Sequence, residues 1–267
     1  HLGGIRLDSM HGILGFEKLP EAFSLALSYL TIIVVINSFN LIDGVDGLAA
    51  SLGILTMLVF GSYFFAIGYQ AYALLAFAMA GSLAAFMIFN HHPARIFMGD
   101  SGSLMIGLIN AILVIKFINV ANDPLVAVPV PSAVAIGFGI LIVPLLDTLR
   151  VFSIRILNGQ SPFTPDRNHV HHLLLDRGMD HAAVTLTCVS VNIGFIILAW
   201  FGRHLGPNYL MLLMLTLAFS GLGLLYYKRP RRAVLIAKRS DGVATMQTKG
   251  TKVVTLTKEK EAQSAVD

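Results

Sequence analysis

Long apolar runs alternate with short polar segments along most of the chain. A bilayer with a hydrocarbon core about 30 Å thick is spanned by about 20 apolar residues in a helix. Seven runs reach that length, and we expect helices over roughly 22–40, 48–68, 71–89, 103–120, 128–148, 182–202 and 208–227. The pattern predicts an all-α fold, a polytopic transmembrane helix bundle with about seven helices.

The apolar periodicity stops after Lys228 and the sequence becomes polar. We therefore expect a membrane-embedded domain over residues 1–230 and a basic, polar, disordered cytoplasmic tail over 231–267. Composition agrees with a membrane protein, because 55% of the residues are hydrophobic and only 13% are charged, against roughly 25% charged in soluble domains. The single cysteine, Cys188, excludes an internal disulfide. The chain starts at His1 without a signal peptide, so we expect it to lack the N-terminus of a longer protein.

The distribution of Lys and Arg predicts the orientation. If residues 40–47 face the cytoplasm, then 90–102, 149–181 and the tail do too. Up to Arg239, these segments carry eleven Lys and Arg, against four on the other side. The positive charge is thus explained by topology in a lipid bilayer, and we expect no nucleic-acid partner. Nearly all the Asp, Asn and His residues that could perform chemistry lie on this same side, which favours an enzyme site there.

The first polar segment ends the first apolar run. Asn37, Asn40 and Asp43 recur at a spacing of three, which places them on one side of a helix end. Asp46 follows between two glycines, which permit a tight turn. Polar side chains at membrane depth are costly and indicate a functional site. The alternative is a helix-ending turn with solvated carboxylates, in which Asp46 caps the next helix.

The second polar segment, Gly99-Asp100-Ser101-Gly102-Ser103, opens an apolar run. The start of a helix presents unpaired N–H groups and a positive dipole end, which suit a phosphate. Asp100 would repel that phosphate unless a divalent cation lay between them, and Mg²⁺ is commonly held by carboxylates together with phosphate oxygens. The alternative is that Asp100 only favours the helix dipole.

The third polar segment is a loop rich in cationic side chains. It contains Arg155, Arg167, His169, His171 and His172. The histidines could ligate a transition metal, or the whole cluster could bind phosphates, for which Arg is well suited. The chain has no HExxH motif and no cysteine partner, which disfavours zinc in this loop. For the arginines, positive-inside topology is the alternative. His91, His92, His181 and His204 lie at expected helix ends and are interpreted as interfacial.

Taken in this order, the three segments resemble the bacterial polyprenyl-phosphate N-acetylhexosamine-1-phosphate transferases over about residues 1–230. The resemblance implies about ten or eleven helices in the whole family domain and a requirement for Mg²⁺ or Mn²⁺. It implies transfer of a sugar-1-phosphate from a UDP-N-acetylhexosamine to undecaprenyl phosphate, with release of UMP, at the cytoplasmic side of the bacterial inner membrane. The loop from Pro162 to His172 is similar to the branch that uses UDP-N-acetylglucosamine for O-antigen, capsule or teichoic-acid synthesis. It resembles less the phospho-N-acetylmuramoyl-pentapeptide transferases of peptidoglycan synthesis.

The resemblance also implies roles for individual residues. The catalytic residues it implies are Asp43, Asp46, Asp100 and His169, with Asp100 as the metal ligand. The substrate-binding residues it implies are Asn37, Asn40, Phe97, Ser101, Arg155, Arg167, His171 and His172.

The family's early Asp-Asp pair has no counterpart in this sequence. We therefore expect about three or four helices to precede His1 in the parent protein, and the fragment alone to be inactive. A homodimer is left open. The rival function is a membrane transporter, which the clustering of polar groups at one face and the lack of an internal repeat disfavour.

Overall fold

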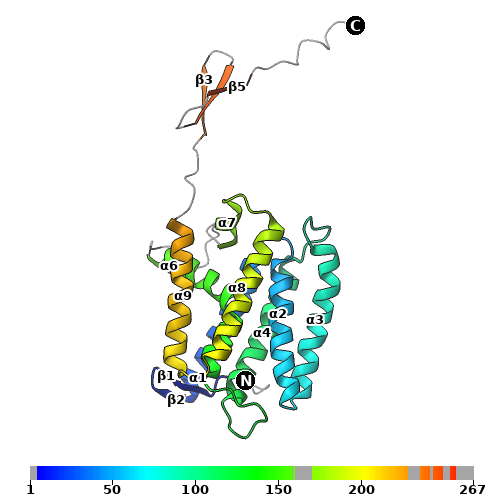
Figure 1. Ribbon diagram of the computed structural model, residues 1–267, viewed down its shortest axis with the longest axis vertical. Coiled ribbons are helices and arrows are strands. Elements are labelled where there is room, and N and C mark those ends of the chain that lie inside the picture. The colour runs from blue at the N-terminus through cyan, green and yellow to red at the C-terminus, as the bar shows by residue number, and fades with distance from the viewer. Residues whose placement is uncertain are drawn as a thin grey trace. The chain divides into compact units, whose positions relative to one another are not determined.

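The computed structural model describes residues 5–157, 159, 170–227, 235–240, 243–248 and 253–256. The chain divides into two compact units, residues 1–228 and 229–267. The first unit begins with an antiparallel hairpin and continues with helices that run back and forth (Figure 1). Its elements are β1 (Ser9–Ile13), β2 (Phe16–Lys18), α1 (Glu21–Ile42), α2 (Leu48–Ala66), α3 (Gln70–Asn90), α4 (Gly99–Ala121), α5 (Ala133–Ile140), α6 (Ile142–Leu157), α7 (Val170–Leu175), α8 (His181–Phe201) and α9 (Pro207–Tyr227).

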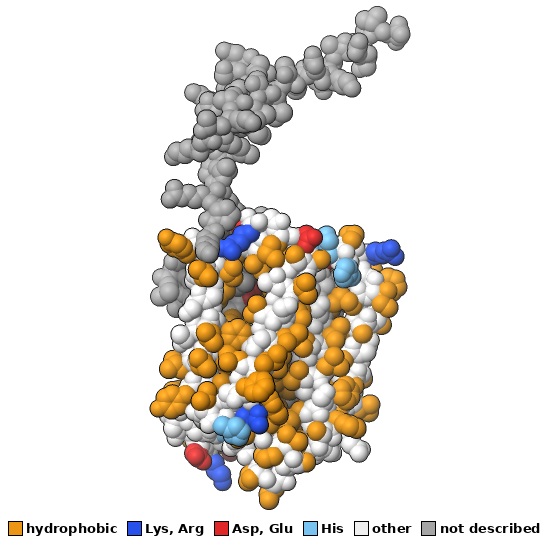
Figure 2. All heavy atoms as spheres, in the orientation of Figure 1, with side chains coloured by type: hydrophobic (Ala, Val, Ile, Leu, Met, Phe, Trp, Pro, Cys, Tyr) orange, Lys and Arg blue, Asp and Glu red, His pale blue; other side chains and the backbone are white. Residues whose placement is uncertain are grey.

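The predicted helical bundle is confirmed. Among the described residues, six helices are long and apolar enough to cross a membrane, and there are seven spans if the bent pair α5 and α6 is counted as one. On the face drawn in Figure 2, hydrophobic side chains cover the middle of the bundle and charged side chains gather toward its ends. This distribution suits a bilayer, because a charged side chain is costly at membrane depth.

The span expected as one helix over roughly 128–148 is in fact two helices. α5 and α6 meet at an angle of 81° around Leu141. Pro144 has no N–H to bond the carbonyl of Ile140 four residues earlier, so the break falls where the helix is weakest. Asn192 of α8 replaces the missing bonds. Its Nδ2 donates to the Ile140 carbonyl at 3.0 Å and its Oδ1 accepts from the Val143 N–H at 3.2 Å.

Close packing of α1 against α4 sets the position of the polar end of the bundle. A Cβ added at Gly107 of α4 would lie 2.6 Å from the Cα of Ile36 in α1. Only glycine permits this approach of two backbones. The two helices run in opposite directions. Residues one turn closer to the C-terminus of α1 therefore face residues one turn closer to the N-terminus of α4.

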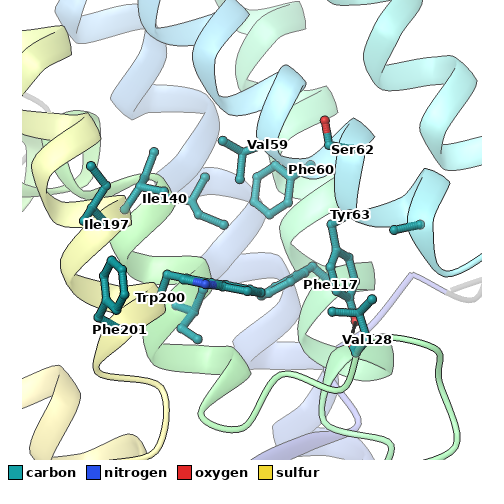
Figure 3. A pocket seen from close by; sticks show the side chains of 13 residues that line it. Val59, Phe60, Ser62, Tyr63, Phe117, Val128, Ile140, Ile197, Trp200 and Phe201 are labelled. Carbon is teal, nitrogen blue, oxygen red and sulfur yellow. Dashed lines mark hydrogen bonds between the residues drawn. The ribbon is translucent and has the colours of Figure 1, made fainter.

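A large apolar pocket of about 400 Å³ lies at the other end of the bundle, where α2 and α8 end (Figure 3). Its lining includes Tyr63 of α2, Phe117 of α4 and Trp200 of α8. The Tyr63 hydroxyl donates to the carbonyl of Val128 at 3.2 Å, and its ring packs edge-on against Phe117. None of the described residues that line this pocket is charged, so its chemistry does not suit a nucleotide or a diphosphate.

The second unit contains an antiparallel three-stranded sheet in the order β3 (Leu235–Ser240), β4 (Val243–Thr248) and β5 (Val253–Leu256). These strands lie within the segment for which the sequence predicts a disordered polar tail. Together with the β1–β2 hairpin, they are the strands among the described residues of an otherwise helical chain.

Candidate functional site

Three segments far apart in the sequence meet at one end of the bundle. They are the α1–α2 turn (residues 43–47), the α3–α4 loop (residues 91–98) and the first turn of α8 (Figure 1). The alternating direction of the helices brings their connections to this end. The sequence predicts that the polar residues able to take part in chemistry lie on one face. This is confirmed for the α1–α2 turn and the start of α4, which lie at the same end of the bundle.

Asn40 joins the first and second polar segments. Its side-chain amide donates to the Oδ1 of Asp100 and to the Oγ of Ser103, both at 3.1 Å. Asp100 is exposed in the first turn of α4, whereas Ser103 is fully buried. A hydrogen bond to a carboxylate is stronger than one between neutral groups. Asn40 therefore holds the Asp100 carboxylate in one orientation at the helix start.

Asp43 lies next to Asp100 and is affected by its charge. Burial, followed by repulsion from Asp100, raises the pKa of Asp43 to about 6. Two carboxylates that repel one another and offer only oxygen atoms are a ligand set that Mg²⁺ prefers. The residues present therefore fit a hard divalent cation, with Asp43 and Asp100 as the residues that would hold it.

Asp46 is held from three directions. Its Oδ2 lies 2.7 Å from the Nδ1 of His92 and 3.4 Å from the Nδ1 of His181, and it accepts the N–H of Ala94 at 3.3 Å. Partial burial acts to raise the pKa of Asp46, but these hydrogen bonds and the neighbouring imidazoles hold it below its usual value. The α8 residue Thr185 adds a hydrogen bond to the Asp46 carbonyl at 3.0 Å.

The alternative interpretation of Asp46 as a helix cap does not describe the structure. The N-cap residue of α2 is Gly47, in the left-handed region with φ +74°, and no side chain caps it. Asn90, buried at the end of α3, accepts the N–H of Gly47 at 3.0 Å. The amide of Asn90 also donates to the carbonyl of Ile96 at 2.9 Å. Asn90 thereby fastens the α1–α2 turn to the α3–α4 loop.

Three residues at this site were not among those expected from the sequence, namely Asn90, His92 and His181. The interfacial interpretation of the two histidines is incomplete, because both contact Asp46. Only a weak local feature of the sequence marks these three residues. Each residue is a polar position at the end of an apolar run, and such positions are common at membrane interfaces.

A small polar pocket of about 170 Å³ lies between these residues. Asp43, Asp46, Asn90, Phe97 and His181 contribute to its lining. The ring of Phe97 is 81% exposed, so its face is open to a planar ligand. A flat exposed ring beside carboxylates is an arrangement that can bind a nucleobase by stacking.

Among the expected residues whose side chains the structure describes, Asn37 and Ser101 do not join this cluster. Asn37 donates to the carbonyl of Ile33 in its own helix at 2.7 Å, and Ser101 is exposed. Arg167 and His169 lie outside the described residues. Arg155, His171 and His172 lie in α6 and α7, but their side chains are outside what the structure describes. The roles predicted for the residues of this loop stay predictions.

Comparison with known proteins finds a family model that matches the first part of the chain. Residues 1–118 match the family model described as glycosyl transferase family 4. Over this segment the chain is similar to glycosyl transferase family 4. The matched segment includes Asn40, Asp43, Asp46, Phe97 and Asp100. It also contains all the residues that line the pocket of about 170 Å³, except His181. The loop from Pro162 to His172 lies beyond it.

Curated relatives agree with this family. The chain is 29% identical over 244 residues to an undecaprenyl-phosphate alpha-N-acetylglucosaminyl 1-phosphate transferase of Escherichia coli O157:H7, covering 88% of this chain and 63% of the relative. The transferase of the same name from Yersinia pestis is 30% identical, covering 89% of this chain and 64% of the relative. A decaprenyl-phosphate N-acetylglucosaminephosphotransferase of Mycobacterium tuberculosis is 33% identical, covering 66% and 46%. The chain thus spans between about half and two thirds of the length of these relatives.

Proposed function

We propose that this chain is the larger part of an enzyme that transfers N-acetylglucosamine-1-phosphate from UDP-N-acetylglucosamine to undecaprenyl phosphate and releases UMP. The reaction would take place at the cytoplasmic face of a bacterial inner membrane and would start the synthesis of a cell-envelope polysaccharide. The observation that carries this proposal is the convergence of Asn40, Asp43 and Asp100 at one end of a membrane bundle. The names of the relatives supply the substrate class.

The donor nucleotide would bind at the small polar pocket. The exposed Phe97 ring offers a surface for the uracil base, and the Asp46 carboxylate beside it offers a hydrogen-bond acceptor for a base N–H. The diphosphate would then extend toward Asp43 and Asp100, where the first turn of α4 presents backbone N–H groups. The arginines and histidines between 155 and 172 are proposed to contribute further contacts to the diphosphate.

The cation proposed for this site is Mg²⁺ or Mn²⁺, held by Asp100 together with Asp43. Bound there, such an ion would neutralise charge on the diphosphate and on the departing UMP. The protein residues provide positioning. Asn40 keeps the Asp100 carboxylate directed toward the site, and Asn90 keeps the α1–α2 turn in place.

In the proposed reaction, an oxygen of the lipid phosphate attacks the sugar-linked phosphorus of the donor. The bond from that phosphorus to the bridging oxygen breaks, and UMP leaves with the electron pair. The new bond makes a lipid-linked diphosphate sugar. Phosphoryl transfer of this kind depends on alignment and charge stabilisation, which matches a site built from carboxylates, an amide and a helix start.

A transfer assay tests the proposal. Membranes containing the chain, alone and joined to the N-terminal helices of a relative, are incubated with undecaprenyl phosphate, Mg²⁺ and radiolabelled UDP-N-acetylglucosamine. We expect label in the lipid phase only with the joined protein, and its loss with EDTA or in Asp100→Asn by at least about two orders of magnitude.

Other outcomes separate the alternatives. Near-normal transfer by Asp100→Asn would exclude Asp100 as the metal ligand. Transfer only from UDP-N-acetylmuramoyl-pentapeptide would assign the peptidoglycan branch. No transfer from any UDP-sugar by a folded protein would contradict the proposal, and solute uptake without UMP release would assign a transporter.

A further inference from the structure

Two histidines and one aspartate from three separate segments direct ligand atoms to a common point. Asp46 belongs to the α1–α2 turn and His92 to the α3–α4 loop, and His181 is the first residue of α8. Their ligand atoms all lie within 4.8 Å of one another. Both histidines approach the same carboxylate oxygen through the same ring nitrogen, Nδ1.

One distance to the Asp46 oxygen already matches a coordination site, and the other would have to change. Zinc binds His nitrogen and carboxylate oxygen at about 2.0–2.2 Å, so two ligand atoms on one tetrahedral ion lie about 3.3–3.5 Å apart. The Asp46 Oδ2 to His181 Nδ1 distance of 3.4 Å already matches. The 2.7 Å distance to His92 would have to increase by about 0.7 Å. His92 lies on a loop with its side chain 36% exposed, and a loop residue can make such a shift.

Coordination would also displace existing hydrogen bonds. The Nδ1 of His181 accepts the backbone N–H of Asp46 at 3.3 Å, and a metal ion would take that lone pair. The two imidazole rings do not obstruct one another. Their centroids are 5.0 Å apart and the ring planes are tilted by 31°.

The donor atoms select the class of metal. Imidazole nitrogen suits zinc, cobalt and nickel, whereas Mg²⁺ prefers oxygen ligands. We propose that Asp46, His92 and His181 form a binding site for a zinc-type divalent transition-metal ion, separate from the oxygen-ligand pair Asp43 and Asp100. Three protein ligands leave one position of a tetrahedral ion for water or for a ligand atom. The polar pocket of about 170 Å³, which Asp46 and His181 both line, provides room for it.

The consequence for activity rests on the proposed function. Asp46 shares the pocket wall with Phe97 and Asp43. An ion bound to its carboxylate would withdraw Asp46 from contact with the nucleotide. Zinc would therefore inhibit transfer by raising the KM for the UDP-sugar, and an excess of Mg²⁺ would not relieve the inhibition.

The binding test needs neither sugar nor lipid substrate, so its outcome is independent of whether the proposed transfer takes place. The 267-residue chain in detergent, with millimolar Mg²⁺ present, is titrated with Zn²⁺ by calorimetry and with Co²⁺ by visible absorption. Because the chain has nine histidines, the decisive quantity is a difference between variants. His92→Gln and His181→Gln are compared with His91→Gln, the matched substitution at the adjacent residue.

We expect His92→Gln and His181→Gln each to lose one equivalent of bound metal and the Co²⁺ band of a four-coordinate site. His91→Gln should keep both. Equal stoichiometry in all three variants would overturn the proposal and would leave a hydrogen-bonded Asp–His cluster. The unsubstituted chain provides a test that does not depend on folding of the variants, because absence of a four-coordinate Co²⁺ band there would also overturn it.

Discussion

Gly107 of α4 lies against the backbone of Ile36 in α1, so closely that an added Cβ would be 2.6 Å from the Ile36 Cα. One helical turn further along, Ser103 of α4 contacts Asn40 of α1. The close crossing therefore brings the amide of Asn40 within reach of Asp100. A packing feature in the apolar part of the bundle thus determines the geometry of its polar end.

Gly107→Ala should destabilise the chain and disturb the site together. The added methyl group meets backbone atoms that cannot rotate away, and overpacking of this kind costs about 1–3 kcal/mol. Thermal unfolding in detergent measures the effect. Gly81→Ala is the matched control, because a Cβ at this helical position meets nothing within 4 Å. Equal melting temperatures for the two variants would contradict the close-packing argument.

Asn40→Ala should lower transfer about 10- to 100-fold with little loss of stability. It removes hydrogen bonds to the Asp100 carboxylate and to Ser103, and a hydrogen bond to a charged group is worth about 1.5–3 kcal/mol. Transfer by the protein joined to the N-terminal helices of a relative is measured as a function of Mg²⁺ concentration, and the variant should need more Mg²⁺. Asn122→Ala, at the opposite end of the bundle, is the control. An unchanged Mg²⁺ dependence in Asn40→Ala would show that Asn40 does not orient the metal ligand.

Phe97→Ala should raise the KM for the UDP-sugar and leave folding unchanged. The ring is 81% exposed, so it contributes little to the core, while stacking on a base is worth about 1–3 kcal/mol. We expect a roughly 5- to 150-fold increase in KM and rescue by Phe97→Trp. Phe201→Ala removes an equally exposed ring at the opposite end and should have no effect. A change confined to kcat would contradict a role in nucleotide binding.

Asp43 should make stability fall with rising pH between about 4 and 6. Its pKa is about 6 in the folded chain and about 3.8 in the unfolded chain, so the folded state binds more protons in this window. Stability is therefore lost as pH rises through the folded pKa. Since this half-buried carboxyl is screened by solvent, the effect should be on the order of 1 kcal/mol.

The pH effect is measured with EDTA present, as the difference in melting temperature between the unsubstituted chain and Asp43→Asn at pH 4.5 and pH 7. The unsubstituted chain should lose stability relative to Asp43→Asn at the higher pH. Asp123→Asn, in the loop that follows α4, is the matched substitution. If the unsubstituted chain instead gained stability relative to Asp43→Asn on going to pH 7, the raised pKa of Asp43 would be disproved.

The sequence by itself determined the helical bundle and the two segments that carry its described polar site. About 20 apolar residues in a row have few alternatives to a membrane helix, because the bilayer cannot satisfy other backbone conformations. The expected runs therefore correspond to α1–α4, α8 and α9. The polar residues between these runs had to lie at the helix ends, near the membrane surface. Their spacing placed Asn40 and Asp43 on one side of α1.

Contacts between elements were decided only by the tertiary structure. Asn37, Asn40 and Asp43 recur at a spacing of three at the end of α1. Asn40 lies where α4 crosses α1 and reaches Asp100, whereas Asn37 bonds to a carbonyl of its own helix. His92 and His181 are 89 residues apart in the chain and meet at Asp46 because α3 and α8 both place an end beside the α1–α2 turn. Local spacing determines which side chains share a helix face. Which faces meet depends on glycine contacts and on polar groups such as Asn192, whose partners become neighbours only when the helices pack.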